Sequence, residues 1–179
     1  EVTVIDNGSI DSSINMVKDE FSKVNFILIE KNLGYSKAYN YAFKELKESD
    51  SDYYFLLNND TIINKDTISK LIIASFQYGE NNIYGPKIIN SNNNLIWYAG
   101  GKINYFTFTP YHVGINNTND ITEFKLSNTE FISGCSMLVK KNIIDKLDGF
   151  NDSYEFYYED VDLCLRAKLL ESNCIYVNN

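Results

Sequence analysis

Short apolar runs and amphipathic segments alternate along the first half of the chain. The β-branched and aromatic runs at residues 1–6, 25–30 and 53–57 predict three buried strands. Between them, residues 11–24 and 35–47 carry apolar side chains at helical spacing, which predicts two amphipathic helices. This order is typical of βαβ units.

A third helix is expected over residues 65–79, with Gly79 as its stop. Its apolar positions share one face of the predicted helix, and they are Ile68, Leu71, Ile72 and Phe76. We therefore expect this face to pack on the sheet.

The pattern changes after residues 82–89. Residues 90–128 are rich in Asn, Gly, Thr and aromatic residues, which favours irregular hairpins and loops and suggests a substrate-shaping insertion. The remaining expected elements are a strand at 129–141, a short helix at 142–147, a helix at 159–171 and a strand at 173–179.

Strands that alternate with helices predict an α/β fold, with a doubly wound, mostly parallel sheet and helices on both faces. In such a fold, ligands bind outside the carboxyl ends of the strands. No internal repeat or linker is visible, so we expect one domain over residues 1–179. The chain opens on Glu1 in a strand-like run, which suggests a piece of a longer protein.

Composition narrows the function classes. The formal net charge of -8 argues against a general nucleic-acid binder, which needs clustered Lys and Arg. Cys135, Cys164 and Cys174 are too scattered for a disulfide framework or a zinc site, and we expect buried free thiols in a reducing compartment. No run has the length of a transmembrane helix and no signal peptide is visible, so a cytoplasmic location is expected.

Polar residues follow the first two predicted strands. Asp6, Gly8 and Ser9 come where the first strand ends, and a glycine turn explains Gly8 but not an acid at the end of an apolar run. After the second strand, Gly34 makes a turn into a helix whose first amides suit a phosphate, and Lys37 adds a positive charge. A structural loop glycine remains an alternative for Gly34.

Asn58, Asn59 and Asp60 follow the third predicted strand, where unpaired polar groups would be costly to bury. Together with Asp6, they form a row of oxygen acceptors at one sheet edge. Such acceptors suit ribose hydroxyls, base N–H groups and a hard cation such as Mg²⁺ or Mn²⁺.

A fourth group, Glu159, Asp160 and Asp162, begins a predicted helix. Acids there are stabilised by the helix dipole, and the same placement keeps a carboxylate ionised for use as a general base. Both interpretations apply to these residues. Arg166 stands four residues after Asp162 and is expected to pair with it, whereas His112 in the Asn-rich segment is expected to face solvent.

Five motifs occur in order: "VIDNGSIDSS", "NLGYSKAYN", "LLNNDT", "FISGCSMLVKK" and "GFNDSYEFYYEDVDLCLR". With these motifs the chain resembles glycosyltransferase family 2, particularly its rhamnosyltransferase-like bacterial members. The resemblance implies a GT-A fold and an inverting transfer of a sugar from a nucleotide-diphosphate donor, a UDP- or dTDP-sugar, to a glycan or lipid-linked acceptor. It also implies Mn²⁺ or Mg²⁺ as the cofactor, and a role in surface polysaccharide synthesis, with association at the inner face of the membrane left open.

The resemblance also implies roles for single residues. Asp6 would read the pyrimidine base, with Gly8 and Ser9 shaping its turn, and Asp60 would hold the metal. Asp160 would be the catalytic base, with Glu159 as the second candidate.

Other residues depart from the family pattern or keep two interpretations. Asn58 stands where many family members have an acid, so a second carboxylate on the metal is not expected, and Asn59 shapes the turn. Gly134 lies under the donor sugar or serves as a close-packed strand glycine. Trp97, Gly100 and Gly101 fall where acceptor or sugar contacts are plausible, but core packing and a turn are the favoured interpretations.

The family's earlier nucleotide-binding strand is missing from this sequence and is expected to pair beside the strand that contains Asp6. A sugar-phosphate nucleotidyltransferase and a truncated, non-catalytic nucleotide- or carbohydrate-binding domain remain alternatives. No G-x-G-x-x-G follows a strand, which disfavours a dehydrogenase.

Overall fold

The computed structural model describes residues 1–119 and 125–178. Its helices are α1 (Ser13–Glu20), α2 (Tyr35–Glu45), α3 (Thr67–Tyr78), α4 (Lys141–Leu147) and α5 (Glu159–Lys168). Its strands are β1 (Thr3–Asn7), β2 (Asn25–Ile29), β3 (Tyr53–Leu57), β4 (Ile83–Pro86), β5 (Ile88–Ile89), β6 (Ile96–Tyr98), β7 (Gly101–Asn104), β8 (Thr109–His112), β9 (Leu126–Thr129), β10 (Ser136–Lys140) and β11 (Cys174–Val177).

The central sheet has five strands in the order β3-β10-β4-β11-β9. β4 and β11 are parallel, whereas β10 runs antiparallel to both of its neighbours and β9 runs antiparallel to β11. The sheet is therefore mixed rather than mostly parallel, because the chain reaches β10 and β9 through loops and hairpins instead of crossover helices.

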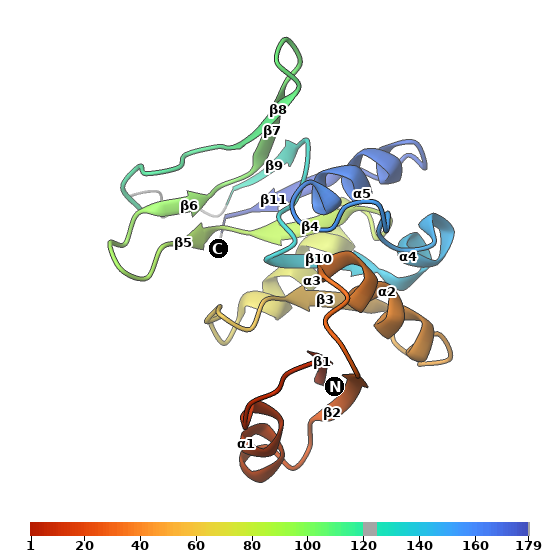
Figure 1. Ribbon diagram of the computed structural model, residues 1–179. Coiled ribbons are helices and arrows are strands. Elements are labelled where there is room, and N and C mark those ends of the chain that lie inside the picture. The colour runs from red at the N-terminus through yellow and green to blue at the C-terminus, as the bar shows by residue number, and fades with distance from the viewer. Residues whose placement is uncertain (120–124, 179) are drawn as a thin grey trace.

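Besides the central sheet, the described residues form three two-stranded sheets. β1 and β2 form a parallel pair, set apart from the central sheet in Figure 1, and β5–β6 and β7–β8 are antiparallel hairpins. The hairpins confirm the prediction for the Asn-rich segment. One edge of β1 pairs with β2, and the other edge pairs with no strand in the described residues. This free edge is where the family resemblance predicts the missing nucleotide-binding strand.

Helices cover both faces of the central sheet, as the sequence predicts. On one face, Leu71 and Ala74 of α3 pack against buried side chains of β4, β10 and β11. On the other face, α2, α4 and α5 enclose the larger core, to which they contribute Phe43, Ile144 and Leu163. A third, smaller cluster joins α2 to the β1–β2 pair.

Two predicted helical details are wrong. α3 buries Leu71 and Ala74, but Ile68 and Phe76 are exposed, because the face toward the sheet is centred one position away from the predicted stripe. α1 is shorter than predicted, and it has no buried residue in the described structure.

The predicted strand at 129–141 is also divided. Only its second half forms a strand, β10, and Gly134 lies in the turn before it. Gly134 is therefore not the close-packed strand glycine that we considered as one of its two interpretations. No helix in the described part of the chain is long and apolar enough to cross a membrane.

Candidate active site

The turn after β1 is held by Asp6 and fits tightly against the next loop. Both carboxylate oxygens of Asp6 accept a hydrogen bond from the Ser9 amide at 3.3 Å. Gly8 has φ of 81°, and a Cβ at this position would lie 2.7 Å from the backbone nitrogen of Asn32. The glycine thus lets two backbone segments meet, while the Asp6 carboxylate stays only half-buried at the sheet edge.

Asn7, which the sequence analysis did not single out, ties the first polar cluster to the second. Its Oδ1 accepts from the Leu33 amide at 2.8 Å, and its Nδ2 donates to the Gly34 carbonyl at 3.2 Å. Gly34 has φ of 81° and leads directly into α2, as predicted. Lys37 is exposed on the first turn of that helix.

The turn after β3 presents Asn59 and Asp60 to solvent. The Asn58 amide donates to the carbonyl of Cys135 at 3.0 Å, and the Asn58 carbonyl accepts from the Thr61 hydroxyl at 2.5 Å. These backbone bonds shape the turn without using the Asp60 carboxylate, which accepts no hydrogen bond from the residues that the structure describes.

Gly134 links the start of α2 to the start of α5. Its amide donates to Oδ2 of Asp160 at 2.9 Å, and its carbonyl accepts from the Tyr35 hydroxyl at 2.8 Å. A Cβ on this glycine would lie 2.7 Å from that same hydroxyl. Gly134 therefore joins the second motif, which contains Tyr35, to the acidic helix, and a side chain there would push Tyr35 away.

Asp160 is held at the first turn of α5 by two backbone amides. Its second oxygen, Oδ1, accepts from the Val161 amide at 2.8 Å. Burial raises the pKa of Asp160, while the hydrogen bonds from Gly134 and Val161 and the nearby His112 lower it, so that the net direction is upward. A carboxyl group that is desolvated yet oriented has the properties that a general base needs.

Glu159 lies beside Asp160 and is less constrained. Burial also raises its pKa, with a smaller contribution from the charge of Asp160. Its Oε2 atom is buried and has no hydrogen-bond partner within the described residues. An unpaired buried oxygen is costly, so this atom is available to a ligand hydroxyl.

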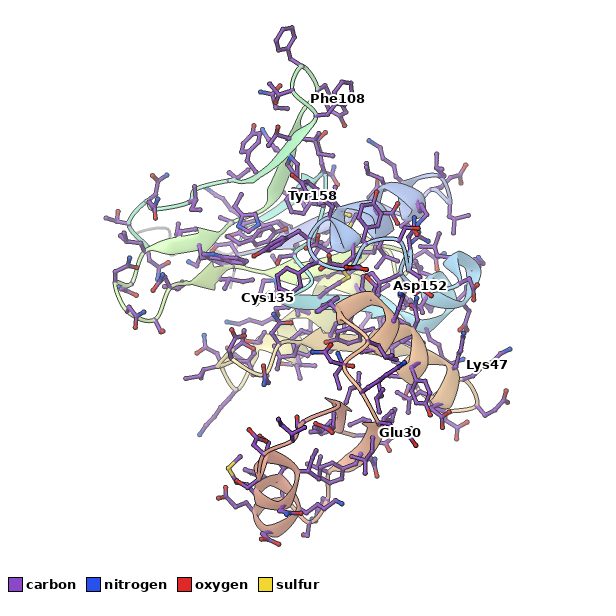
Figure 2. All side chains as sticks on the ribbon, in the orientation of Figure 1. Glu30, Lys47, Phe108, Cys135, Asp152 and Tyr158 are labelled. Atoms are coloured by element: carbon purple, nitrogen blue, oxygen red, sulfur yellow. The ribbon has the colours of Figure 1, made fainter. Side chains whose placement is uncertain are left out.

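The half-buried Cys135 follows Gly134 in the turn before β10, near the middle of the molecule (Figure 2). Burial, with smaller contributions from the carboxylates of Asp60 and Asp160, raises the pKa of its thiol to about 11. The Cys135 carbonyl accepts from the Asn58 amide, so this residue joins the turn after β3 to the turn that holds Asp160. All three cysteines are free as predicted, but Cys135 is only partly buried.

His112 does not face solvent as predicted. It is half-buried, with Nδ1 at 3.1 Å from the Trp97 carbonyl and its ring edge-on to Trp97 and Tyr98. Burial lowers its pKa, and the charge of Asp160 opposes that shift. The β7–β8 hairpin thereby brings a histidine from the Asn-rich segment toward Asp160.

The predicted partner of Arg166 is confirmed, because its Nε donates to Asp162 Oδ2 at 2.7 Å. The assignments of Trp97 and Gly100 to structure also agree with the contacts. Trp97 packs on the main core, and Gly100, with φ of 106°, lies between β6 and β7. Gly101 is not in a turn as predicted, because it begins β7, where it approaches Phe131 closely.

The residues present fit a divalent cation only in part. Among residues 1–119 and 125–178, no group of three or more His, Cys, Asp or Glu side chains is placed to hold a metal ion. Asp60 offers an exposed carboxylate, a ligand that Mn²⁺ and Mg²⁺ accept, and the nearby Asn58 offers a neutral oxygen. An ion here would need further oxygen ligands from a bound diphosphate or water.

The polar clusters that the sequence separates thus form one connected site. Asn7 joins the turn after β1 to the loop before α2, Tyr35 joins α2 to Gly134, and Gly134 joins Asp160. Two contributors, Asn7 and Tyr35, were given no role from the sequence, and His112 was expected to face solvent. Tyr35 follows the turn glycine directly, which was the one available signal for it.

Curated relatives of this chain are rhamnosyltransferases and a hexosyltransferase. Rhamnosyltransferase WbbL of Escherichia coli K12 is 28% identical over 78% of this chain and 54% of its own length. Hexosyltransferase Agl10 of low-salt glycan biosynthesis in Haloferax volcanii is 26% identical over 94% of this chain and 53% of its own. The N-acetylglucosaminyl-diphospho-decaprenol L-rhamnosyltransferase of Mycobacterium tuberculosis is 24% identical, with 90% and 59% covered.

Solved structures share the fold. GalNAc-T7, crystallised with UDP, GalNAc and Mn²⁺, superposes with a TM-score of 0.77 at 14% identity, covering 99% of this chain and 36% of that one. TarS 1–349 of S. aureus, in complex with UDP, gives a TM-score of 0.66 at 15% identity and covers all of this chain and 51% of its own. The predicted GT-A fold is thereby confirmed.

The chain spans between about half and three-fifths of the length of these curated relatives. The model of the family described as "Glycosyl transferase family 2" matches residues 1–148, which is most of the chain and includes four of the five motifs in full. The chain belongs to glycosyl transferase family 2.

Proposed function

We propose that this chain carries the donor site and the catalytic base of an inverting glycosyltransferase. The enzyme moves a sugar from a UDP- or dTDP-sugar to a hydroxyl of a glycan or lipid-linked acceptor, at the cytoplasmic side of the membrane in bacterial surface polysaccharide synthesis. The observation that carries this proposal is the buried carboxylate of Asp160, which accepts from the Gly134 amide at 2.9 Å in the same turn whose Cys135 carbonyl accepts from the Asn58 amide at 3.0 Å. The names of the curated relatives support it.

The donor occupies the edge formed by the turns after β1 and β3. Asp6 lies at the end of β1, where a half-buried carboxylate accepts an N–H of the pyrimidine base, and Gly8 and Ser9 keep that turn narrow. Asn58 accepts from the ribose, and the first amides of α2 after Gly34, together with Lys37, face the diphosphate. Asn59 only shapes its turn.

Asp60 holds Mn²⁺ or Mg²⁺, which when bound supplies positive charge to the departing diphosphate. Because this chain would contribute one carboxylate, an ion here would need the diphosphate or water for its other oxygen ligands. We therefore expect the ion to bind weakly without nucleotide.

Asp160 removes the proton of the acceptor hydroxyl while that oxygen attacks the anomeric carbon. The bond from this carbon to the diphosphate oxygen breaks on the opposite face, so the configuration inverts and the nucleoside diphosphate leaves. Gly134 leaves room for the donor sugar, and Tyr35 holds the Gly134 turn in place through its hydroxyl. Glu159, with one unpaired oxygen, accepts a neighbouring hydroxyl of the acceptor.

The test is a thermal shift of the complete protein with Mn²⁺ and UDP, dTDP or GDP. We expect stabilisation by Mn²⁺ with one of the pyrimidine nucleotides, since a ligand that binds only the folded state raises its stability. Asp60→Asn should remove the Mn²⁺-dependent part of the shift, whereas Asp19→Asn, an exposed acid on α1, should leave it unchanged. No shift with any pair would overturn the donor site.

A nucleotidyltransferase is disfavoured by membership of the family. The remaining alternative is a domain that binds nucleotide or carbohydrate without catalysis. Product analysis with a panel of nucleotide sugars separates the two, because a binding domain would show the thermal shift and release no nucleoside diphosphate.

A further inference from the structure

The β7–β8 hairpin ends in a group of exposed aromatic side chains that the proposed function does not use. Figure 1 shows the hairpin projecting from the body of the molecule, and Figure 2 places Phe108 near its far end. Phe106 is 93% exposed, Phe108 79% and Tyr105 60%. Large apolar side chains exposed together mark an interaction surface.

We propose that the tip of this hairpin, residues 105–108, inserts into the lipid–water interface and seats the enzyme on the membrane that carries its acceptor. The proposal rests on the proposed function, in which the acceptor is lipid-linked. Tyr and Phe are the residue types that favour the lipid–water boundary, where an apolar ring enters the lipid and a polar group stays wet.

Hydrogen bonding within the tip favours a lipid surface over a saccharide. The Asn104 carbonyl oxygen Oδ1 accepts from the amides of Phe106 at 2.9 Å and Thr107 at 3.2 Å, and the Thr109 hydroxyl donates to the Thr107 carbonyl at 3.3 Å. The side chains of Asn104 and Thr109, which flank the tip, are thus used to satisfy its backbone, and the Tyr105 hydroxyl is used by Glu130. Satisfied backbone groups are also what an apolar medium requires.

Charge supports the same partner. Residues 101–119 contain no Asp or Glu, and Lys102 is their one formal charge, in a chain whose net charge is -8. An acidic protein is repelled by anionic headgroups, so a segment without acids is the part best able to approach them.

The aromatic rings are not needed to make the turn. Phe108 has φ of 54°, a left-handed conformation that favours Gly or Asn and that costs other residues about 1–2 kcal/mol. The chain therefore places a large apolar ring where a small residue would form the turn with less strain.

The hairpin is fixed in orientation and grows from the candidate active site. Glu130 accepts from the Ile103 amide and the Tyr105 hydroxyl, both at 2.6 Å, which braces the hairpin against the central sheet. His112, whose charge interacts with Asp160, is four residues from Phe108 along β8, about 13 Å at the rise of an extended strand. An inserted tip would hold the proposed catalytic base, Asp160, close above the membrane surface.

The experiment measures co-sedimentation of the complete protein with vesicles of phosphatidylcholine and phosphatidylglycerol. We expect the double variant Phe106→Ser, Phe108→Ser to bind vesicles at least about tenfold more weakly than the wild type, since neither position can then bury an aromatic ring in lipid. The matched control is Phe76→Ser, which alters a 68% exposed phenylalanine on α3 and should bind like the wild type. Phe108→Trp should show a blue-shifted fluorescence when vesicles are added.

Other outcomes overturn the proposal. If the wild type gives the nucleotide thermal shift but does not sediment with vesicles, the docking is wrong and the proposed function stands. If the double variant sediments normally and instead loses transfer to a lipid-free saccharide acceptor, the hairpin binds sugar. Absence of the thermal shift concerns the donor site alone, so the two failures are distinguishable.

Discussion

At the scale of single residues, the site depends on one desolvated carboxylate and on glycines that bring backbone segments together. Asp160 has both oxygens on backbone amides and is largely removed from water, so its charged form is costly in the folded protein. Gly8 and Gly34 have the same φ of 81° but very different surroundings. These contrasts make the contributions of charge and of close packing separately measurable.

We expect Asp160→Asn to abolish transfer, by about 10²- to 10⁴-fold, and to leave the nucleotide thermal shift in place. Burial raises the folded pKa of Asp160 above its unfolded value, so ionisation makes the folded state less stable as pH rises. The stability of the variant relative to the wild type should therefore increase from about pH 4 up to the folded pKa and then stay constant. Urea unfolding at a series of pH values measures this.

The same shift affects activity. Transfer by the wild type should fall as pH decreases through the raised pKa, at a higher pH than an ordinary aspartate would give. Glu159→Gln is the matched comparison and should retain transfer. If Glu159→Gln abolishes transfer while Asp160→Asn does not, Glu159 is the base.

Gly8→Ala should destabilise the protein more than Gly34→Ala. The equal φ values cost both variants about 1–2 kcal/mol, so the difference between them reports the available space. A Cβ on Gly8 would lie 2.7 Å from the backbone of Lys31 and Asn32, whereas one on Gly34 would lie 3.2 Å from the Glu155 carbonyl. Unfolding midpoints in urea compare the two, and equal losses would contradict the backbone clash.

At the scale of elements, α5 carries Glu159 and Asp160 in its first turn, and hydrogen bonds from Arg166 attach this helix to the end of α4. Arg166 binds Asp162 on the same helix, and its other two nitrogens donate to the carbonyls of Leu147 and Gly149 at 3.0 and 2.9 Å. Leu147 is the last residue of α4 and Gly149 lies just beyond it. The last carbonyl groups of a helix have no partners within that helix, and the guanidinium supplies donors for them. One guanidinium thus fixes the loop that leads to Asp160.

We expect Arg166→Lys to lower the free energy of unfolding by about 1–3 kcal/mol, because an ammonium group cannot reproduce the three directed bonds. Lys168→Arg, an exchange at an exposed position on the same helix, should have little effect. Chemical denaturation measures both variants. An equal stability of Arg166→Lys and the wild type would show that the charge alone matters.

Sequence patterns predicted most of these elements, and their failures have physical causes. Periodicity identified α2, α3, α5 and the strands between them, because each buries one face. It missed the antiparallel direction of β10, since a strand's apolar pattern is the same in either direction. His112 was placed in solvent because its neighbours, Trp97 and Tyr98, reach it only across a hairpin.

At the scale of the whole molecule, the candidate donor site and the candidate base belong to different cores. Asp6 lies in β1 and Gly8 follows it, and the sheet of this strand is backed by the small cluster that includes Ala38 and Ala42 of α2. Asp160 begins α5, which packs in the main core. α2 contributes to both, because its Phe43 belongs to the main core, so this helix is the element that carries the two halves of the site together.

Hydrogen exchange of the complete protein tests this division. α1 has no buried residue in the described structure, whereas α5 buries Val161, Leu163, Cys164 and Ala167, so amides of α1 should exchange faster. Addition of Mn²⁺ and UDP should slow exchange in the turns at residues 6–9 and 58–61 and leave the exposed hairpin tip unchanged. Mn²⁺ alone is the control.

We expect slower exchange in both turns because the proposed nucleotide site includes residues from each of them. A nucleotide that reaches from Asp6 to Asp60 bridges the β1–β2 pair and the central sheet, so it must slow the opening of the smaller unit relative to the larger one. If the ligand protects only the turn after β3, the pyrimidine ring of the nucleotide does not bind at the β1 turn, and Asp6 is not part of the donor site. Equal exchange of α1 and α5 without ligand would contradict the assignment of the β1–α1–β2 unit as the less stable part.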